Sequence, residues 1–337
     1  MMAGRVIAII GGAGFIGTEL ARQFLQSGQT VRIVDKRISA TYQALCSTAD
    51  VRDAAALRAA LQGTDIIYNL AAEHKDNVRP TTLYDEVNVQ GARNVCRVAS
   101  ELAIPAIVFT SSVAVYGFAA PDTDETGLLR PFNDYGRTKM EAEGVYQEWL
   151  KDGTQRTLTI VRPTVVFGPR NRGNVYNLLR QMASGRFAMV GSGKNVKSMA
   201  FVENVASLLA AAAGFGPGGH LFNYIDKPDL SMNELVVLVK RCLGSPARIG
   251  LRIPYPAAYL GGLAADIASG IFRRELPISA IRVRKFCATT QFRSSRLAAT
   301  GFVAPVSLTE GLERTIAYEF LGGREKDPGQ STLFESE

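Results

Sequence analysis

The feature that most constrains the fold is an apolar run that leads directly into three regularly spaced glycines near the N-terminus. Residues 6–10 are Val-Ile-Ala-Ile-Ile, and Gly11, Gly14 and Gly17 follow in the pattern G-x-x-G-x-x-G. Apolar residues then recur at helical spacing as far as residue 25. This order predicts a buried strand, a tight turn and a helix, an arrangement that binds the pyrophosphate of a dinucleotide at the N-terminus of the helix.

Each glycine has its own role in such a turn. Gly11 lets the chain turn sharply, Gly14 leaves room for a phosphate to reach the backbone, and Gly17 lets the helix pack close to the strand. Phe15 and Ile16 open the predicted helix and so belong to the same expected site. A glycine-rich turn that binds nothing is the alternative, and the strand before it and the helix after it argue against that reading.

A second predicted strand, residues 30–35, ends in a carboxylate about twenty residues after the glycines. Asp35 is therefore expected to accept hydrogen bonds from the ribose hydroxyls of the cofactor. A carboxylate there repels the 2′-phosphate of NADP, so NAD is the expected cofactor. The neighbouring Lys36 and Arg37 leave NADP open as a second choice.

Strands and helices alternate through the first half of the chain, which predicts an α/β fold with a doubly wound, Rossmann-like parallel sheet. Further strands are expected at residues 44–48, 65–70, 106–110, 158–162 and 221–225. Helices are expected at residues 54–61, 82–102, 135–150, 175–183, 202–213, 232–243 and 309–320. Residues 185–193 are expected to form a hairpin, and Ser231 with Glu234 a capping box.

The rhythm changes after Gly168, which predicts a second, smaller mixed α/β domain that binds the substrate. We expect an NAD-binding domain in residues 1–165, to which residues 200–225 return. Residues 166–199 and 226–321 then form the substrate-binding domain. Residues 322–337 are polar and contain glycines, so a disordered tail is expected there.

The chain has 337 residues and a net charge of +7, which invites a nucleic-acid interpretation. The basic residues are not interleaved with aromatic residues in any run, so nucleic acid is not the expected partner. A small polyanion such as a nucleoside diphosphate fits the charge equally well. A solvated basic surface remains the plain explanation for most of the excess.

The four cysteines lie far apart and only two histidines are present, so neither a metal site nor a disulfide framework is expected. A reducing cytoplasmic location is the corresponding expectation. The longest apolar stretch, residues 257–272, is too short and too interrupted for a membrane span. It is expected to be a packed helix of the second domain, with peripheral contact to a membrane as the alternative.

Tyr135 and Lys139 form a Tyr-x-x-x-Lys pair at the start of a predicted helix. Residues four apart share one face of a helix, so the ammonium of Lys139 is placed to lower the pKa of the Tyr135 phenol. A phenolate-like tyrosine is a competent general base for a hydroxyl group. Ser112, at the end of the strand at residues 106–110, is placed to bond the same substrate oxygen.

With these motifs the chain resembles an extended short-chain dehydrogenase/reductase of the NAD-dependent epimerase/dehydratase branch. The resemblance runs to about Phe320 and is specific for fold, cofactor and the Ser112, Tyr135 and Lys139 chemistry. It implies a homodimer formed through the helices at residues 83–102 and 135–150. It also implies a cofactor site that includes Asp50, Val51, Leu70, Ala71, Ala72, Asn88, Thr110, Lys139 and Pro163.

The resemblance is less specific for the substrate site than for the cofactor site. His74 and Lys75 follow a strand end beside the expected substrate, although an ordinary loop role is equally compatible with them. Asn174 and Lys197 complete the candidates on the second domain, together with the basic group around Arg282, which also contains Arg284 and Lys285.

Three departures from the family pattern bear on the reaction. The acid pair that family dehydratases carry after the catalytic serine is replaced by Val113 and Ala114, which disfavours dehydration. The asparagine that touches a nucleotide diphosphate is replaced by Val165. An Arg-Asp pair of the family is replaced by Lys197 and Ser198, and a lysine meets phosphate as a point charge and not as a fork.

The leading hypothesis is an NAD-dependent nucleotide-sugar 4-epimerase that works through a transient 4-keto sugar. The alternative enzyme is an NAD(P)-dependent reductase or dehydrogenase of a keto-sugar or a sterol-like alcohol, since Val165 and the pattern around Gly301 resemble the hydroxysteroid-dehydrogenase-like branch. The non-enzyme alternative is a protein that senses NAD, against which the complete Ser112, Tyr135 and Lys139 set argues.

Overall fold

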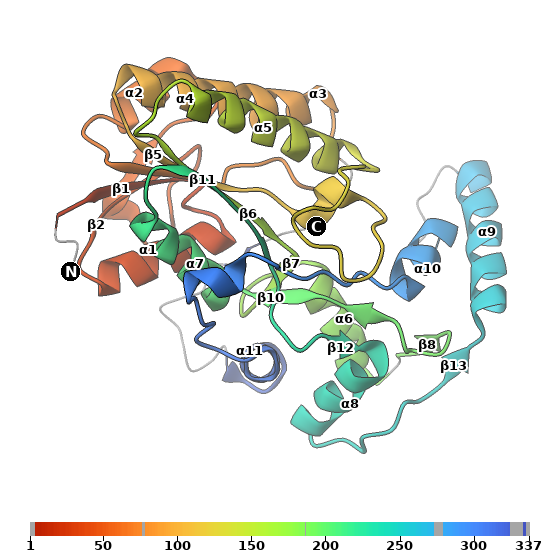
Figure 1. The fold of residues 1–337 in the computed structure, drawn as a ribbon. Helices are drawn as coiled ribbons and strands as arrows, with labels where there is room; N and C mark the ends of the chain where they lie inside the picture. The colour runs from red at the N-terminus through yellow and green to blue at the C-terminus, as the bar shows by residue number, and fades with distance from the viewer. Residues whose placement is uncertain (1–3, 76–77, 186, 273–278, 324–332, 335–337) are drawn as a thin grey trace.

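The computed structural model describes residues 4–75, 78–185, 187–272, 279–323 and 333–334. Its centre is a seven-stranded parallel sheet in the order β11-β6-β5-β4-β1-β2-β3 (Figure 1). The strands are β1 (Val6–Ile10), β2 (Thr30–Asp35), β3 (Cys46–Thr48), β4 (Ile66–Asn69), β5 (Ala106–Thr110), β6 (Thr157–Pro163) and β11 (Gly218–Tyr224). The predicted doubly wound fold is confirmed, and its strand order reverses between β1 and β4, where ligands bind in such sheets.

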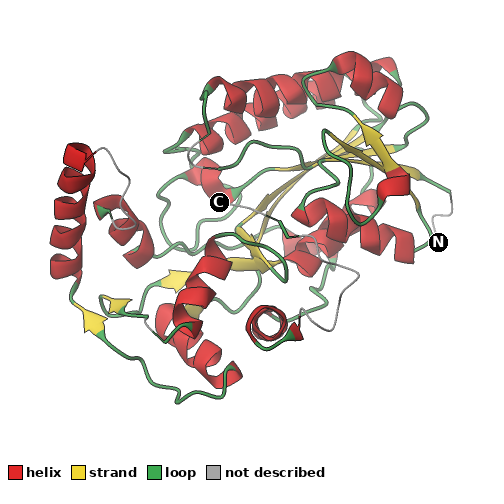
Figure 2. Cartoon of the chain, turned by 180° about the vertical axis from the view of Figure 1, so that it is seen from behind, coloured by secondary structure: helices red, strands yellow, loops and turns green. Residues whose placement is uncertain are grey.

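Helices cover both faces of the sheet, which explains why its central strands are mostly apolar (Figures 1 and 2). One face is packed by α2 (Ala54–Ala60), α4 (Gly91–Glu101) and α5 (Asp134–Lys151), with Ile10, Val95 and Tyr146 in its core. The other face is packed by α1 (Phe15–Gln26) and α7 (Val202–Ala211), with Leu20 and Val205 in its core.

The helix predicted at residues 82–102 contains an irregularity that its apolar spacing did not reveal. A short α3 (Thr82–Tyr84) leads into a π-helical turn, Asp85–Gln90, before α4 begins at Gly91. Such wide turns occur frequently at functional sites. Here the turn carries Asn88, one of the expected cofactor residues.

The remaining elements form a smaller lobe around a separate apolar cluster that includes Leu179, Leu235 and Leu312. Its strands are β7 (Val165–Phe167), β8 (Met189–Val190), β9 (Val196–Lys197), β10 (Met199–Phe201), β12 (Leu230–Ser231) and β13 (Arg252–Ile253). Its helices are α6 (Asn174–Ala183), α8 (Met232–Cys242), α9 (Tyr255–Phe272), α10 (Ala280–Cys287) and α11 (Leu308–Phe320).

Two local predictions for this lobe had different outcomes. The capping box of Ser231 and Glu234 is present at the start of α8. The hairpin expected at residues 185–193 is wrong, because β8 pairs in parallel with the distant β13. Gly191 and Gly193 do turn the chain with positive φ angles of 73° and 68°, but β8 then bonds to β13 instead of folding back on its neighbour.

The predicted disordered tail, residues 322–337, lies largely outside the described residues. Within it Phe334 is placed, and it is buried. Its backbone N–H donates to the carbonyl of Arg170 at 2.9 Å, and its carbonyl accepts from the N–H of Arg172 at 2.7 Å. The end of the chain therefore returns to the loop that precedes α6.

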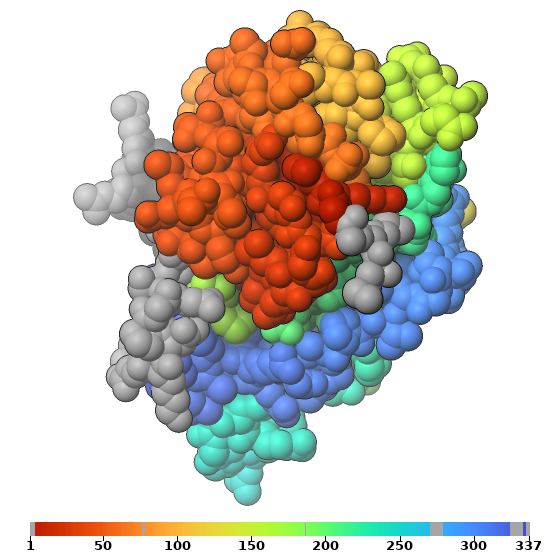
Figure 3. Space-filling view, turned by 90° about the vertical axis from the view of Figure 1, so that its left-hand side faces the viewer, coloured from red at the N-terminus to blue at the C-terminus, as the bar shows by residue number. Residues whose placement is uncertain are grey.

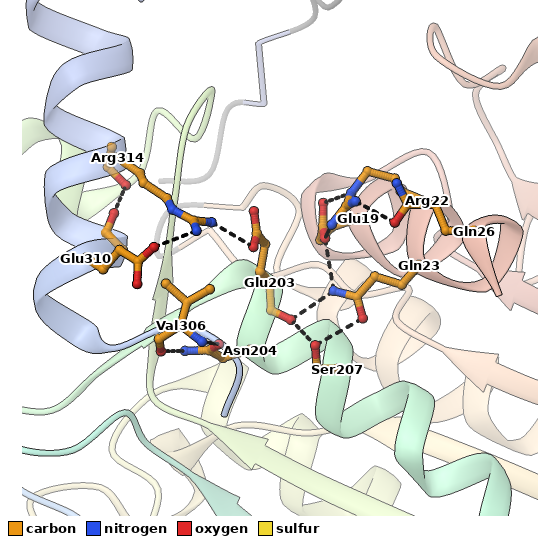
Figure 4. Close-up of polar contacts among 12 residues, drawn as sticks. Glu19, Arg22, Gln23, Gln26, Glu203, Asn204, Ser207, Val306, Glu310 and Arg314 are labelled. Atoms are coloured by element: carbon orange, nitrogen blue, oxygen red, sulfur yellow. Dashed lines mark hydrogen bonds and ion pairs between the residues drawn. The ribbon is translucent and has the colours of Figure 1, made fainter. Parts of the chain in front are cut away.

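A set of polar contacts joins the two lobes through α7 (Figure 4). On α7, the backbone carbonyl of Glu203 accepts from Gln23 of α1 at 3.0 Å, and its carboxylate pairs with Arg314 of α11 at 3.1 Å. The buried Asn204 amide holds both the N–H and the carbonyl of Val306, at 3.0 Å and 2.7 Å. Figure 3 shows the N-terminal part of the chain, in red and orange, beside the C-terminal part, in blue, on one face of the molecule.

Among the described residues, no helix has the length and hydropathy that crossing a membrane requires. The four cysteines are all free thiols.

We predict that Asn204→Ala lowers the free energy of unfolding by at least about 2 kcal/mol, because the buried N–H and carbonyl of Val306 would lose their side-chain partner and Asp226 would lose one of its three hydrogen bonds. Urea unfolding followed by circular dichroism measures the loss. Ser207→Ala, on the same helix, is the control and should cost about 1 kcal/mol or less. Equal losses for the two variants would contradict the role given to Asn204.

Candidate active site

The glycine turn after β1 leaves no room for a Cβ at two of its three glycines. Gly11 has a φ of 76°, and a Cβ there would lie 2.7 Å from the backbone nitrogen of Ala71. A Cβ on Gly17 would lie 2.6 Å from the carbonyl oxygen of Gly11. The N-terminal cap of α1 is Gly14, which has no side chain to occupy the first N–H groups of the helix. The turn therefore fits a pyrophosphate held by backbone N–H groups and the positive end of the helix dipole.

Asp35 stands at the end of β2 beside this turn. Its carboxylate accepts from the backbone N–H of Ala13 at 3.1 Å and from that of Arg37 at 3.0 Å. The ammonium of Lys36 forms an ion pair with the carboxylate of Glu73 at 3.2 Å. The acid is thus fixed against the glycine loop, as binding to the adenosine ribose would require, while the neighbouring lysine is partly neutralised.

The other expected cofactor residues gather at the carboxyl ends of the neighbouring strands. Asp50 follows β3 and pairs with Arg52 at 2.8 Å, a contact that holds the pKa of the Asp50 carboxyl below its usual value. Val51 is buried against Gly91 at the start of α4. Leu70, Ala71 and Ala72 follow β4, and Pro163 ends β6.

Asn88 ties this strand edge to the catalytic helix. Its side chain accepts from the N–H of Glu73 at 2.9 Å and donates to the carbonyl of Glu73 at 3.0 Å. It also donates to the hydroxyl of Thr138 on α5 at 2.9 Å. Asn88 is therefore a positioning residue for the loop after β4, and the π-helical turn is what presents its amide to both partners.

Tyr135 lies in the first turn of α5, and Ser112 lies in the short 3-10 turn that follows β5, Val113–Tyr116 with Ser112 as its cap. The two segments approach closely because Gly136 lacks a side chain: a Cβ there would lie 2.5 Å from the carbonyl of Ala114. The sequence argument did not single out Gly136. Its position directly after Tyr135 was the available signal.

Lys139 is buried one turn further along α5. Its ammonium donates to the carbonyl of Thr110 at 2.8 Å and lies 4.7 Å from the ring centroid of Phe109. Burial lowers the pKa of Lys139 to about 7, against the opposing charge of Glu143. The Tyr-x-x-x-Lys spacing therefore brings the lysine under the sheet edge at the end of β5, as expected for a residue that also meets a cofactor ribose.

A buried charged network underlies these side chains and was not foreseen. Glu143, one turn beyond Lys139, accepts two hydrogen bonds from Arg162 of β6 at 2.8 Å and 2.5 Å, and one from Ser111 at 2.5 Å. Arg162 also donates to the hydroxyl of Tyr116 at 2.6 Å, and Tyr116 donates to Asn223 at 2.8 Å. An arginine within an apolar strand was the sequence signal for a buried partner.

The predicted substrate residues do not all lie together. His74 and Lys75 follow Ala72 in the loop after β4. Burial lowers the pKa of His74, and the positive charges of Lys139 and Lys75 add to the effect while a hydrogen bond to Ala72 opposes it. Asn174 is the first residue of α6, and Arg282 is an exposed residue of α10.

Lys197 is used inside the second lobe. Its ammonium donates to the carbonyls of Lys285 and Ala288, at 2.9 Å and 2.6 Å, at the C-terminal end of α10. Burial lowers the pKa of Lys197 to about 8. The structure thus gives Lys197 a part in anchoring α10, and its expected phosphate contact stays a prediction.

Phe334 is a further residue that the sequence did not mark. Its ring lies 5.6 Å from the ring of Phe15, the first residue of α1, and the guanidinium of Arg170 lies 5.5 Å from its centroid. The end of the chain therefore packs beside the predicted pyrophosphate turn.

Comparison with known proteins agrees with this arrangement. Residues 7–224 match the model of the NAD dependent epimerase/dehydratase family. The chain belongs to this family. It is 46% identical over 327 residues, 95% of its own length and 97% of the relative's, to N-acetyl-alpha-D-glucosaminyl-diphospho-ditrans,octacis-undecaprenol 4-epimerase of Escherichia coli O157:H7. The family match and this relative confirm the predictions of an NAD-dependent enzyme and of a sugar 4-epimerase.

More distant matches extend the comparison. A Stigmatella aurantiaca ketoreductase of a farnesylated dihydroquinoline oxide is 27% identical over 80% of this chain and 81% of its own. The crystal structure of UDP-glucose 4-epimerase from Thermotoga maritima with UDP-glucose superimposes with a TM-score of 0.75 over 95% of this chain and 99% of the other, at 20% identity. The first shows that reductases occur among the relatives, and the second supports the fold.

We predict that NAD binds more tightly than NADP and that Asp35→Asn reduces this preference by about tenfold or more, because the carboxylate that repels a 2′-phosphate is lost. Fluorescence titration of the cofactor-depleted protein with both cofactors gives the ratio. Asp65→Asn is the control, since Asp65 lies at the opposite, amino end of the sheet beside β4. Tighter binding of NADP to the unaltered protein would show that Lys36 and Arg37 dominate.

We predict that the cofactor-depleted protein gains thermal stability relative to Lys139→Met as the pH rises from about 7 to about 9. The folded state has the lowered pKa of about 7 and the unfolded lysine keeps the usual value of 10.5. Between these values the unfolded state binds the extra proton, so the free energy of unfolding rises with pH. Scanning fluorimetry of both proteins across this range tests the prediction, which a constant difference in melting temperature would refute.

Proposed function

We propose that this protein is a 4-epimerase of an N-acetylhexosamine that is joined through a diphosphate to a polyprenol. The observation that carries the proposal is the 46% identity, over 97% of the relative's length, to a protein named as an epimerase of that kind of substrate. Ser112, Tyr135 and Lys139 are all present on the elements that such chemistry needs.

The chain's own residues supply the proton chemistry. Tyr135 takes the proton of the C4 hydroxyl and later returns it to the C4 oxygen, after the 4-keto sugar has turned in the site. Ser112 hydrogen-bonds the same oxygen, and the ammonium of Lys139 stabilises negative charge on the Tyr135 phenol. The glycine turn, Asp35 and the strand ends would hold NAD, which when bound would supply the hydride chemistry at C4.

Epimerisation is favoured over dehydration by the residues beside Ser112. Val113 and Ala114 occupy the turn after it and have no acidic or basic group. Elimination of a neighbouring hydroxyl needs an acid and a base at that place, whereas inversion at C4 needs only the base already assigned to Tyr135.

A nucleotide-diphosphate sugar is the second candidate substrate, because it presents the same sugar and diphosphate to the site. The net charge of +7 suits either substrate. Val165, half exposed on β7, has no side-chain donor for a diphosphate at the position where many nucleotide-sugar enzymes have asparagine. Because both substrates carry a diphosphate, this replacement does not distinguish between them.

We propose the same domain boundaries, cellular location and oligomeric state that the sequence predicts. Residues 1–165 and 200–225 form the NAD-binding domain, and residues 166–199 and 226–321 form the substrate-binding domain. The enzyme is a cytoplasmic homodimer that associates through α4 and α5, a state that sedimentation velocity would test.

The decisive assay incubates the purified protein, without added NAD, with a detergent-solubilised polyprenyl diphosphate that carries N-acetylglucosamine, and separately with UDP-N-acetylglucosamine. Mild acid releases the sugar, and chromatography measures the N-acetylgalactosamine formed. We expect turnover of the polyprenyl substrate and a loss of about 10²- to 10⁴-fold in Tyr135→Phe, because its general base is removed.

Tyr318→Phe, which removes a hydroxyl on α11, is the matched control and should retain activity together with bound NAD. Near-normal activity of a folded Tyr135→Phe protein would remove Tyr135 from the mechanism. Reduction of a 4-keto sugar with matching loss of NADH, and no C4 epimer from either substrate, would make the protein a reductase.

A further inference from the structure

The helices α9 and α10 form a unit, called here the α9–α10 arm, that stands at one edge of the molecule (Figures 1 and 2). The inner face of α9 packs on the start of α10. A Cβ on Gly262 would lie 2.7 Å from the backbone nitrogen of Ala280, and the carboxylate of Asp266 accepts from that same N–H at 3.0 Å. Close approach of the two helices therefore depends on this face of small and polar residues.

The arm is fixed to the second lobe at the end of α10. Lys197 bonds two carbonyls there, and the side chain of Asn195 donates to the carbonyl of Phe286 at 2.8 Å. The rings of Phe187 and Phe286 lie 6.3 Å apart beside these bonds. These contacts fix the orientation of the arm relative to the second lobe.

The outer face of α9 is apolar and exposed. Leu260, Leu263 and Ile267 follow one another at intervals of three and four residues and are 64%, 40% and 67% exposed. This spacing places them on one side of the helix, away from Gly262 and Asp266. Ile281 on α10 is 49% exposed as well. A stripe of large apolar side chains open to solvent marks an interaction surface.

The same part of the chain holds the excess of positive charge. Residues 240–296 contain eleven lysines and arginines and two acids, whereas the whole chain has 38 basic and 31 acidic residues. The segment therefore accounts for the entire net charge of +7. Arg252, Arg282 and Arg284, which flank or belong to the arm, are exposed.

We propose that the outer face of α9, formed by Leu260, Leu263 and Ile267, docks on the surface of an anionic lipid bilayer. Apolar side chains that enter the boundary of the acyl region and basic residues that face anionic headgroups are the two contributions that hold such helices at a membrane. This inference rests on the proposed function, since a polyprenyl diphosphate keeps its chain in the bilayer and the enzyme must come to it.

The arm is joined directly to the segment that carries the catalytic tyrosine. The guanidinium of Arg284 lies 5.1 Å from the ring of Phe118, and the ammonium of Lys285 lies 5.1 Å from the ring of Phe132, three residues before Tyr135. The two rings stack at 4.7 Å and are half exposed. A membrane bound at the arm would therefore lie close to the general base.

Flotation of the full-length protein with lipid vesicles tests the proposal. We expect it to float with vesicles of phosphatidylcholine and phosphatidylglycerol, less with phosphatidylcholine alone, and less again at high salt. The double variant Leu260→Asp/Ile267→Asp should bind the anionic vesicles about tenfold more weakly or worse, because two apolar anchors are lost and two negative charges gained. Val303→Asp/Leu321→Asp, at exposed apolar positions outside the arm, is the control and should float normally.

Epimerase assays in detergent separate this proposal from the proposed function. Retained turnover of the polyprenyl substrate by the double variant, with lost flotation, supports docking by α9. Turnover by the unaltered protein without any flotation overturns the docking proposal and leaves the function standing. Flotation without turnover overturns the function alone. A dimer that the double variant dissociates, with no vesicle binding, would show that a second copy of the chain covers the stripe and would overturn the proposal.

Discussion

The geometry of the active site depends on the buried ion pair between Glu143 and Arg162. Both side chains are almost fully shielded from water, at 2% and 3% exposure, so each would carry a large desolvation cost alone. Ser111 donates a further hydrogen bond to Glu143, and Arg162 donates a further one to the hydroxyl of Tyr116. Because Glu143 lies on α5 with Tyr135 and Lys139, the pair holds this helix against β6. Removing either partner would leave the other as an unpaired buried charge between α5 and β6.

Much of the fold could be predicted, and a cofactor site proposed, because the signals are local. The glycine turn needs a strand before it, a helix after it and no Cβ at Gly11 or Gly17, and all of these conditions are present within twenty residues of sequence. Tyr135 and Lys139 share a helix face for the same local reason. The strand ends follow from the apolar runs that precede them, since parallel strands deliver all their carboxyl ends to one edge of the sheet.

The remaining features depend on partners that are distant in the sequence. Glu143 and Arg162 are nineteen residues apart on different elements, and Lys197 reaches carbonyls of α10 almost ninety residues away. The family motif predicted that Lys197 contacts a phosphate. In the folded chain its ammonium instead bonds two carbonyls at the end of α10. The π-helical turn that presents Asn88 escapes a periodicity argument too, because one extra residue in a turn hardly changes the apolar pattern of a long helix.

The proposed catalytic residues alone do not distinguish a nucleotide sugar from a polyprenyl-linked one, because both would present the same hydroxyl to Tyr135 and the same diphosphate beside it. The difference lies in what is attached beyond the diphosphate, so the discriminating features must lie beyond the catalytic centre. Here the net positive charge and an exposed apolar stripe occur together on the α9–α10 arm, and Arg284 and Lys285 join that arm to the aromatic pair before Tyr135. A soluble nucleotide gives no reason for an apolar stripe at that place, whereas a substrate anchored in a bilayer requires the enzyme to present such a surface near its base.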